Sequence, residues 1–161
     1  MVEEGVAQVG SQAPELALDG SSGRVRLADY RGRQHVALYF MREFSCPMCR
    51  RHVAHLRDMY EMLQGKDTAV LVIGGGERED AARLAAKLAV PFPLLADPDR
   101  ATYHRYGLGK AMVMMQRSGT FLVDKSGVLR YALRASLPLA SLDEAALLAA
   151  IDAAALPPRE G

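Results

Sequence analysis

The sequence predicts an α/β fold, in which one domain contains a central mixed β-sheet flanked by helices. Three observations lead to this prediction. Short apolar runs rich in β-branched residues alternate with longer segments of helical periodicity, a polar connection of hairpin type joins the last two runs, and another helical segment follows them. A length of 161 residues suits one domain with a single sizeable core.

The predicted strands are apolar runs bounded by Gly, Pro, Asp or Ser, and they cover 36–40, 69–73, 120–123 and 128–133. The predicted helices between them cover 47–63, 78–88 and 97–106, where apolar side chains recur on one face. Strand, helix and strand in succession predict a parallel pair of strands joined by a crossover helix.

The end of the chain predicts a hairpin and a final helix. Residues 124–127 read Asp-Lys-Ser-Gly, a short polar connection with a terminal glycine that is typical of a β-hairpin. Ser141 and Glu144 have the spacing of a capping box ahead of the helical run 145–151. This order of elements is the thioredoxin-like arrangement. We expect the domain to occupy residues 11–155, with loose segments at 1–10 and 156–161.

Composition narrows the classes of partner. Lys and Arg number 20 and Asp and Glu number 19, spread along the chain, so no basic surface for nucleic acid or anionic membrane is predicted. The apolar runs are far shorter than the ~20 residues that span a bilayer. The first ten residues lack the layout of a secretory signal peptide, so we expect a cytoplasmic protein whose partners are small molecules or proteins.

Cys46 and Cys49 are the only cysteines, and their positions predict redox chemistry. In a reducing compartment two cysteines this close are poor candidates for a structural disulfide. Cys46 precedes Pro47, which is favoured at the first helical position, so Cys46 lies near the helix N-cap. The positive end of the helix dipole stabilises a thiolate there, which predicts a lowered pKa and a nucleophile. Cys49, one turn further on, is predicted to be the resolving thiol.

A zinc site is the main alternative, since His52 and His55 continue the three-residue spacing of the cysteines. On a helix, however, Cys46 and His55 would lie on opposite sides and roughly 13 Å apart along the axis. One tetrahedral zinc ion cannot collect all four side chains. We therefore expect no metal and no other cofactor, and we predict that both histidines lie at the helix surface or its boundary.

Several segments together resemble the AhpC/TSA group of peroxiredoxins, in particular a peroxiredoxin-like branch with a Cys-Pro-x-Cys turn. The central one runs Tyr-Phe-Met-Arg-Glu-Phe-Ser-Cys-Pro-Met-Cys-Arg over 39–50. The others are the opening strand, its hairpin, the later Phe-Pro-Leu-Leu-Ala-Asp-Pro segment and the hairpin strand, at 10–18, 23–32, 92–98 and 120–127. The resemblance covers nearly the whole chain and implies a thioredoxin-like fold and a thiol peroxidase.

The chain departs from the group at positions that concern mechanism. Tyr39 and Glu43 stand where ordinary peroxiredoxins carry a proline and the Thr or Ser that orients peroxide. Ser118 stands where the group has an arginine, and Arg117 is one residue earlier, so Arg117 is the candidate substrate-binding residue. Gly119 precedes Thr120 where thioredoxins have a cis-proline.

The leading hypothesis is a thiol-dependent peroxidase in which Cys46 attacks peroxide and Cys49 resolves the product to an intramolecular disulfide. An external dithiol, such as a thioredoxin-like protein, would reduce that disulfide. Two alternatives stay open: a thiol–disulfide oxidoreductase of thioredoxin type, and a non-catalytic redox-sensing module. Whether the chain forms a homodimer is equally open.

Overall fold

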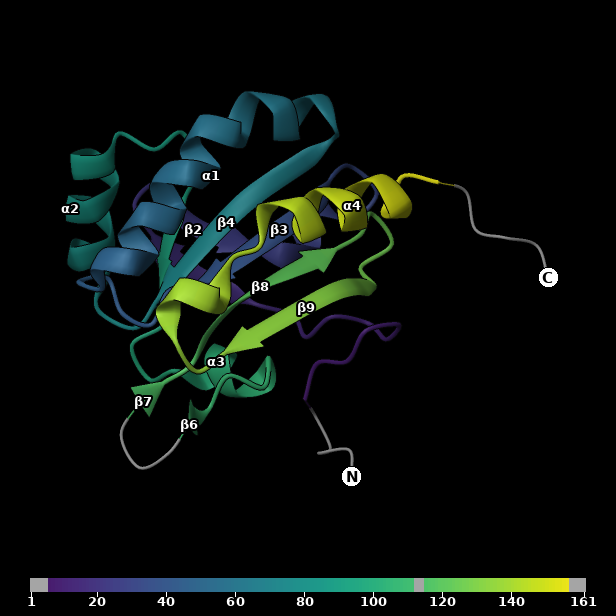
Figure 1. Cartoon of the computed structure of the whole chain (residues 1–161). Coiled ribbons are helices and arrows are strands. Elements are labelled where there is room, and N and C mark those ends of the chain that lie inside the picture. The colour runs from purple at the N-terminus through teal and green to yellow at the C-terminus, as the bar shows by residue number, and fades with distance from the viewer. Residues whose placement is uncertain (1–5, 112–114, 157–161) are drawn as a thin grey trace.

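The computed structural model describes residues 6–111 and 115–156, and Figure 1 shows a central sheet with helices packed against it. Within this part of the chain the main sheet has seven strands in the order β2-β1-β5-β4-β3-β8-β9. Their bounds are β1 Ala17–Gly20, β2 Gly23–Arg26, β3 His35–Phe40, β4 Thr68–Gly74, β5 Leu94–Ala96, β8 Ser118–Val123 and β9 Leu129–Ala135. A small separate sheet pairs β6 (Lys110–Ala111) with β7 (Met115–Gln116). The predicted α/β architecture with a mixed sheet is confirmed.

The helices divide between the two faces of the sheet. The core on one face joins sheet residues to α1 (Pro47–Gly65), α2 (Arg78–Leu88) and α4 (Glu144–Ala154), which lie on the same side of the sheet in Figure 1. The core on the other face contains α3 (Ala101–Arg105) and the short 3-10 helix η1 (Leu27–Tyr30). A second 3-10 helix, η2 (Pro138–Ser141), leads from β9 to α4. None of the helices in the described ranges is long and apolar enough to cross a membrane.

Strand β3 lies inside the sheet, between β4 and β8, and determines where the cysteines lie. It runs parallel to β4 and antiparallel to β8, and Phe40 near its end pairs with both Ile73 and Gly119. Because side chains alternate along a strand, Tyr39 and Met41 enter the core below α1, whereas Phe40 enters the opposite core. The loop that follows β3 therefore leads directly into α1 on the face where Tyr39 is buried.

Two helix starts differ from the prediction. The helix expected over 97–106 begins only at Ala101, because Arg100 has a left-handed backbone (φ 58) and the Asp97 carboxylate accepts hydrogen bonds from the amides of Thr102 and Tyr103. The predicted Ser141–Glu144 capping box is wrong. Asp143 is the N-cap of α4 and accepts from the amide of Ala146, whereas Ser141 is buried in η2.

The N-terminal segment is only partly as predicted. Residues 1–5 lie outside the described residues, but those from 6 to 10 are not loose. Ala7 is buried and its amide donates to the carbonyl of Arg105, while the Arg134 guanidinium donates to the carbonyl of Ala7 over 2.7 Å. Gly10 donates to the carbonyl of Leu129. Backbone contacts of this kind carry no side-chain signal, so the sequence pattern did not indicate them.

Candidate active site

Cys46 is the N-cap of α1, as predicted. Its backbone is extended (φ −66, ψ 115), Pro47 is the first helical residue, and the amide of Cys49 donates to Cys46 Sγ over 3.4 Å. Proline at this position lacks the N–H that a helix start leaves unpaired, which explains why the helix begins here. The sulfur of Cys46 thus receives a backbone donor at the positive end of a 19-residue helix.

Both thiols are free and buried. Cys46 is only 2% exposed, although it lies where a loop meets the helix, and Cys49 is fully buried. The reason is that the loop before Cys46 folds inward, so that Met41 and Phe44 join the same core as the two cysteines. A small oxidant therefore has easier access to Cys46 than a bulky protein disulfide has.

Cys49 has the properties of a thiol that does not ionise readily. Burial raises its pKa to about 12, and its hydrogen bond with Cys46 acts in the same direction. The amide of Arg42 donates to Cys49 Sγ over 3.3 Å, and this bond and the one with Tyr39 oppose the rise without cancelling it. At neutral pH Cys49 is therefore a thiol, as a resolving cysteine at rest should be.

The loop between β3 and α1 is held by donors from distant parts of the chain. The Tyr103 hydroxyl donates to the carbonyls of Met41 and Ile73, and Arg100 Nη1 donates to the carbonyl of Arg42 over 3.0 Å. From α1 itself, Arg50 Nε donates to the carbonyl of Phe44 over 2.7 Å. Sequence reasoning missed these anchoring residues. Their acceptors are backbone carbonyls up to 62 residues away, which leave no local pattern.

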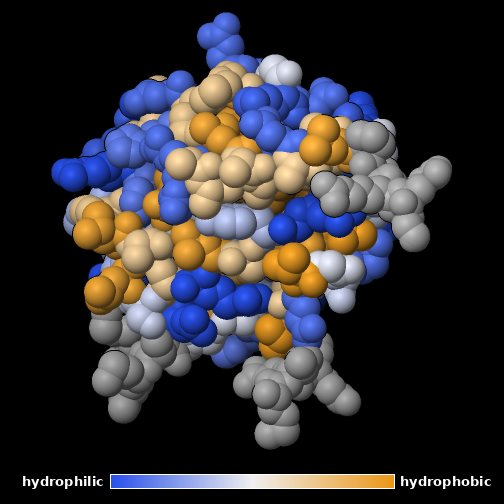
Figure 2. Space-filling view, turned by 45° about the vertical axis from the view of Figure 1, so that its right-hand side comes forward, coloured by the Kyte–Doolittle hydropathy of each residue, from blue (hydrophilic) through white to orange (hydrophobic). Residues whose placement is uncertain are grey.

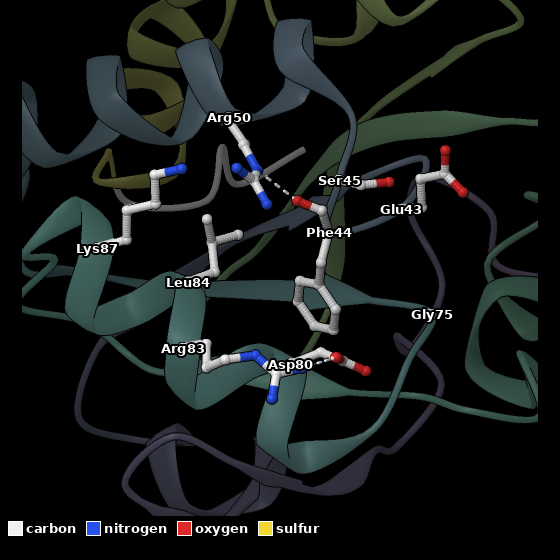
Figure 3. A pocket seen from close by; sticks show the side chains of 9 residues that line it. All are labelled: Glu43, Phe44, Ser45, Arg50, Gly75, Asp80, Arg83, Leu84 and Lys87. Carbon is white, nitrogen blue, oxygen red and sulfur yellow. Dashed lines mark hydrogen bonds and ion pairs between the residues drawn. The ribbon is translucent and has the colours of Figure 1, made fainter.

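A pocket of about 460 Å³ lies beside this loop. Figure 3 shows Leu84 and the Phe44 ring between Arg50 on one side and the Asp80–Arg83 ion pair on the other. The full lining is Glu43, Phe44, Ser45, Arg50, Gly75, Asp80, Arg83, Leu84 and Lys87. Three of these residues, Glu43, Phe44 and Ser45, directly precede Cys46, so the pocket adjoins the loop that leads to it.

Glycine is required where Phe44 meets β4. A Cβ on Gly74 would lie 2.3 Å from the Phe44 ring, and one on Gly75 would lie 2.3 Å from the Arg100 guanidinium. Both distances are far below van der Waals contact. Gly74 therefore lets the loop between β3 and α1 pack directly on the end of the sheet, and Gly75 leaves room for Arg100.

Tyr39 and His52 form a buried polar cluster with Ser141. The Tyr39 hydroxyl lies 3.0 Å from His52 Nδ1 and 2.8 Å from Ser141 Oγ. The prediction that His52 lies at the helix surface or its boundary is wrong, because His52 is buried, with only 7% exposed. His55 is at the surface as predicted, and its Nδ1 lies 3.0 Å from a carboxylate oxygen of Glu144. The two histidines thus have separate partners, and no group of three or more His, Cys, Asp or Glu side chains suited to a metal ion occurs within residues 6–111 and 115–156.

A second cavity, of about 670 Å³, lies on the other side of His52. Its lining mixes apolar side chains from α1, β9 and η2 with charged ones, and consists of Met48, Arg51, His52, His55, Leu133, Leu139, Ala140, Leu142, Asp143 and Glu144. Figure 2 shows the same mixture of hydrophobic and hydrophilic residues over the face that carries α4 and β9. The imidazole of His52 therefore has Tyr39 on one side and an open cavity on the other.

The positions that depart from the family pattern lie at three different places. Glu43 is half-exposed and pairs with the Arg42 guanidinium over 3.4 Å. Arg117 Nη1 donates to the carbonyl of Gly107 over 3.3 Å, and its Nε is buried with no hydrogen-bond partner among the described residues. Gly119 lies within β8, where a Cβ would approach the carbonyl oxygen of Leu133 to 2.3 Å. The described contacts of Arg117 are thus with Gly107 rather than with Cys46.

Several known proteins resemble this chain in sequence or in fold. Alkyl hydroperoxide reductase E of Mycobacterium tuberculosis is 33% identical over 127 residues, which cover 77% of this chain and 83% of that protein. The crystal structure of peroxidoxin BcpB from Mycobacterium tuberculosis matches with a TM-score of 0.81 at 19% identity, over 91% of this chain and 97% of that chain. A putative thiol:disulfide interchange protein DsbE from Chlorobium tepidum matches with a TM-score of 0.72 at 27% identity, over 92% and 98% of the two chains.

These likenesses confirm the predicted thioredoxin-like fold. At the level of sequence, the model of the AhpC/TSA family matches residues 9–132, a range that contains both cysteines, the loop before them and the β8–β9 hairpin. Since that range is well over half of the sequence, the chain belongs to the AhpC/TSA family.

Proposed function

We propose that this protein is a thiol-dependent peroxidase in which Cys46 is the nucleophile and Cys49 the resolving thiol. The observation that carries the proposal is the position of Cys46 Sγ at the N-cap of α1, where it accepts from the amide of Cys49. The alkyl hydroperoxide reductase among its relatives supports peroxide as the substrate class. The burial of both thiols, which favours small oxidants, supports it as well.

The cycle has three balanced steps. The Cys46 thiolate attacks the terminal oxygen of a hydroperoxide, the O–O bond breaks, and the alcohol or water leaves as Cys46 becomes a sulfenic acid. Cys49 sulfur then attacks Cys46 sulfur, releasing water and forming a disulfide. An external dithiol, of the kind that a thioredoxin-like protein carries, reduces this disulfide by two thiol–disulfide exchanges and is itself oxidised. A cytoplasmic location, where such reductants are kept reduced, fits this cycle.

Arg117 is the substrate-binding cation of this proposal. The register that pairs Phe40 with Gly119 brings the start of β8 to the end of β3, from which the loop to Cys46 departs. The buried Arg117 Nε, without a hydrogen-bond partner among the described residues, is a donor available to a bound oxygen atom. In the Arg117→Met variant the rate of Cys46 oxidation should fall at least tenfold, while Arg105→Met, a change at an arginine on α3, should leave it unaltered.

Stopped-flow oxidation tests the peroxidase directly. The reduced protein is mixed with hydrogen peroxide or cumene hydroperoxide, and thiol loss is followed by rapid quenching with an alkylating reagent and mass spectrometry. The proposal requires Cys46 to react with at least one peroxide orders of magnitude faster than free cysteine. A rate equal to that of free cysteine with both peroxides overturns it.

A thiol–disulfide oxidoreductase is the second candidate, favoured by the Cys-x-x-Cys spacing and by the likeness to the DsbE protein at 27% identity. Insulin reduction by the reduced protein, with a reductant present, separates this candidate from the peroxidase. Turnover of insulin together with slow peroxide oxidation favours the second candidate. Fast peroxide oxidation without insulin turnover favours the first.

A further inference from the structure

The buried cluster around Tyr39 connects the resolving cysteine to three elements of the fold. Tyr39 comes from β3, His52 from α1 and Ser141 from η2, and all three side chains are buried. The Tyr39 hydroxyl is 3.0 Å from His52 Nδ1 and 2.8 Å from Ser141 Oγ, and these last two atoms are 3.3 Å apart. Thr120, opposite Tyr39 in the sheet, fixes η2 by donating to the carbonyl of Ser141 over 2.6 Å.

Donor counting assigns the protons in this cluster. Ser141 Oγ lies 2.6 Å from the carbonyl of Pro138, which can only accept, so the serine hydroxyl donates there. The contact between Tyr39 and Ser141 is then a hydrogen bond only if Tyr39 donates to Ser141 Oγ. In that case His52 Nδ1 carries a hydrogen and donates to the Tyr39 oxygen. This arrangement satisfies both contacts of the Tyr39 hydroxyl and keeps the phenol oxygen polarised by an N–H group.

The same hydroxyl lies beside Cys49, because Cys49 is one helical turn before His52 on α1 and is buried in the same core as Tyr39. Burial raises the pKa of Cys49 to about 12, and a hydrogen bond from Tyr39, made when its hydrogen turns away from Ser141, acts in the opposite direction. Burial also raises the pKa of Tyr39 far above its ordinary value, so Tyr39 stays protonated and remains a donor. The Arg42 amide is the other donor to Cys49 Sγ, at 3.3 Å. A thiolate on Cys49 would thus be held by one backbone N–H group and one phenol.

We propose that Tyr39 is a catalytic hydrogen-bond donor for the resolving step, in which it stabilises the thiolate that Cys49 forms before it attacks, while His52 and Ser141 position its hydroxyl. This inference rests on the proposed peroxidase cycle. As Cys49 ionises, the Tyr39 hydrogen turns from Ser141 to the sulfur. His52 Nδ1–H continues to donate to the phenol oxygen and thereby strengthens Tyr39 as a donor.

The step balances without another reagent. Cys49 sulfur forms a bond to Cys46 sulfur, the S–O bond of the Cys46 sulfenic acid breaks, and the proton lost by Cys49 leaves with the hydroxide as water. Cys49 sulfur is oxidised and Cys46 sulfur is reduced from the sulfenic to the disulfide level. In the reverse direction, when an external thiol attacks Cys46, the same donor stabilises Cys49 as the leaving thiolate.

The surroundings of His52 keep it neutral in this role. Burial lowers its pKa, and the neighbouring charges of His55 and Arg51 lower it further, whereas Glu144 has the opposite effect. The groups that face His52 are Arg51, His55 and Cys49 from α1, Tyr39 from β3, Ser141 from η2, and Asp143 and Glu144 from the start of α4. A neutral Nδ1–H tautomer donates to Tyr39 without placing a charge in the core.

The experiment measures the two chemical steps separately in the full-length protein. Rapid quenching with dimedone and an alkylating reagent, read by mass spectrometry, gives the rate of Cys46 oxidation and the rate of disulfide formation. In Tyr39→Phe, which keeps the ring, disulfide formation should fall about three- to tenfold, because a hydrogen bond to a charged group is lost and the lower fraction of Cys49 thiolate is offset in part by its higher nucleophilicity. The pH profile of disulfide formation in this variant should shift to higher pH, because its Cys49 thiolate is less stable. Cys46 oxidation should change less than threefold.

Variants of the two histidines supply the controls. His52→Leu removes the donor to Tyr39 and should slow disulfide formation, whereas His52→Gln keeps an N–H group and should restore part of the rate. His55→Ala, a change on the same helix but at the surface, should form the disulfide at the wild-type rate. Circular dichroism melts confirm that each variant is folded, and Ser141→Ala replaces Tyr39→Phe if the latter does not fold.

The outcomes are distinguishable. If wild-type Cys46 is not oxidised by peroxide, the proposed function fails. If Cys46 is oxidised and the folded Tyr39→Phe or Ser141→Ala protein forms the disulfide at the wild-type rate with an unshifted pH profile, the role of Tyr39 is overturned while the peroxidase stands. A slower step with an unshifted profile also overturns it, because that result indicates altered packing only.

Discussion

The backbone amide of Cys49 donates to Sγ of Cys46 over 3.4 Å. The residue proposed to resolve the oxidised sulfur therefore also holds that sulfur at the helix start before the reaction. Because this donor belongs to the backbone, it survives replacement of the Cys49 side chain. The two roles of residue 49 can consequently be separated by mutation.

The first prediction concerns the division of labour between the cysteines. Cys46→Ser should abolish turnover with any oxidant. Cys49→Ser should still take up one equivalent of peroxide and stop at a sulfenic acid or mixed disulfide on Cys46, since the amide at position 49 still donates to the sulfur. Mass spectrometry after one equivalent of oxidant reads both results. An adduct on Cys49 in the Cys46→Ser protein, with Cys46 unmodified in Cys49→Ser, would mean that the roles are reversed.

The second prediction is a loss of stability at alkaline pH. Burial raises the pKa of Cys49 to about 12, whereas an unfolded cysteine titrates near 8.5. Between these values the unfolded chain has released a proton that the folded chain retains, so the free energy of unfolding falls as pH rises. Urea titrations at pH 8 and pH 10 should show a fall about 2 kcal/mol larger for the wild type than for Cys49→Ser. An equal fall in the free energy of unfolding of the two proteins would show that the pKa of Cys49 is not raised.

The third prediction concerns Gly74, on which the Phe44 ring packs. In Gly74→Ala the new methyl would lie 2.3 Å from that ring, so Phe44 and the loop before Cys46 must move. We expect a loss of about 1–3 kcal/mol in the free energy of unfolding and slower oxidation of Cys46. Gly65→Ala is the matched control, because a Cβ there meets no atom within 4 Å. If the two variants behave alike in urea titration and stopped flow, the packing argument is wrong.

The fourth prediction concerns Asp124 in the β8–β9 connection. Its carboxylate accepts from the amides of Ser126 and Val128 and from Arg130 Nε at 2.6 Å, and these bonds outweigh the effect of burial, so its pKa is lowered. The group therefore contributes stability that is present above the unfolded pKa of about 3.9 and is lost as pH falls through the folded value.

Asp124→Ala should accordingly reduce the free energy of unfolding at pH 7 by about 1–3 kcal/mol and flatten its decline below pH 4. Asp58→Ala, which removes only an exposed ion pair with Arg57, should change stability by less than about 0.5 kcal/mol. Urea titrations between pH 3 and pH 7 measure both. A decline of unchanged steepness in Asp124→Ala would show that another carboxylate is responsible.

The sequence predicted those features that depend on residues close together in the chain. The helix over 78–88 was placed correctly, the four strands predicted from apolar runs to within two residues at each end, and Cys46 at the N-cap beside Pro47, whereas β5, a strand of three residues, was not predicted. The predicted start of α3 and the predicted N-cap of α4 were wrong. Each depends on one competing local interaction, the Asp97 carboxylate in the first case and the Asp143 side chain in the second.

The surroundings of the site could not be predicted in the same way. Tyr39 and His52 are 13 residues apart along the chain, and His52 and Ser141 are 89 residues apart. Only the sheet register together with the path of η2 brings the three side chains into contact. A lone histidine next to a helical cysteine gives no sign of burial. Tyr39 was noticed only as a departure from the family pattern, and its hydrogen bonds required the fold.

Both cysteines belong to a single helical turn, and this limits what oxidation can do to the protein as a whole. A disulfide between positions 46 and 49 closes a loop of four residues, which constrains the unfolded chain by only about 2 kcal/mol, against nearly 5 for a loop of a hundred residues. Oxidation should therefore change the stability of the fold much less than a disulfide between distant segments would. Alternation between dithiol and disulfide should leave the global fold in place and shift its melting temperature by less than about 10 °C.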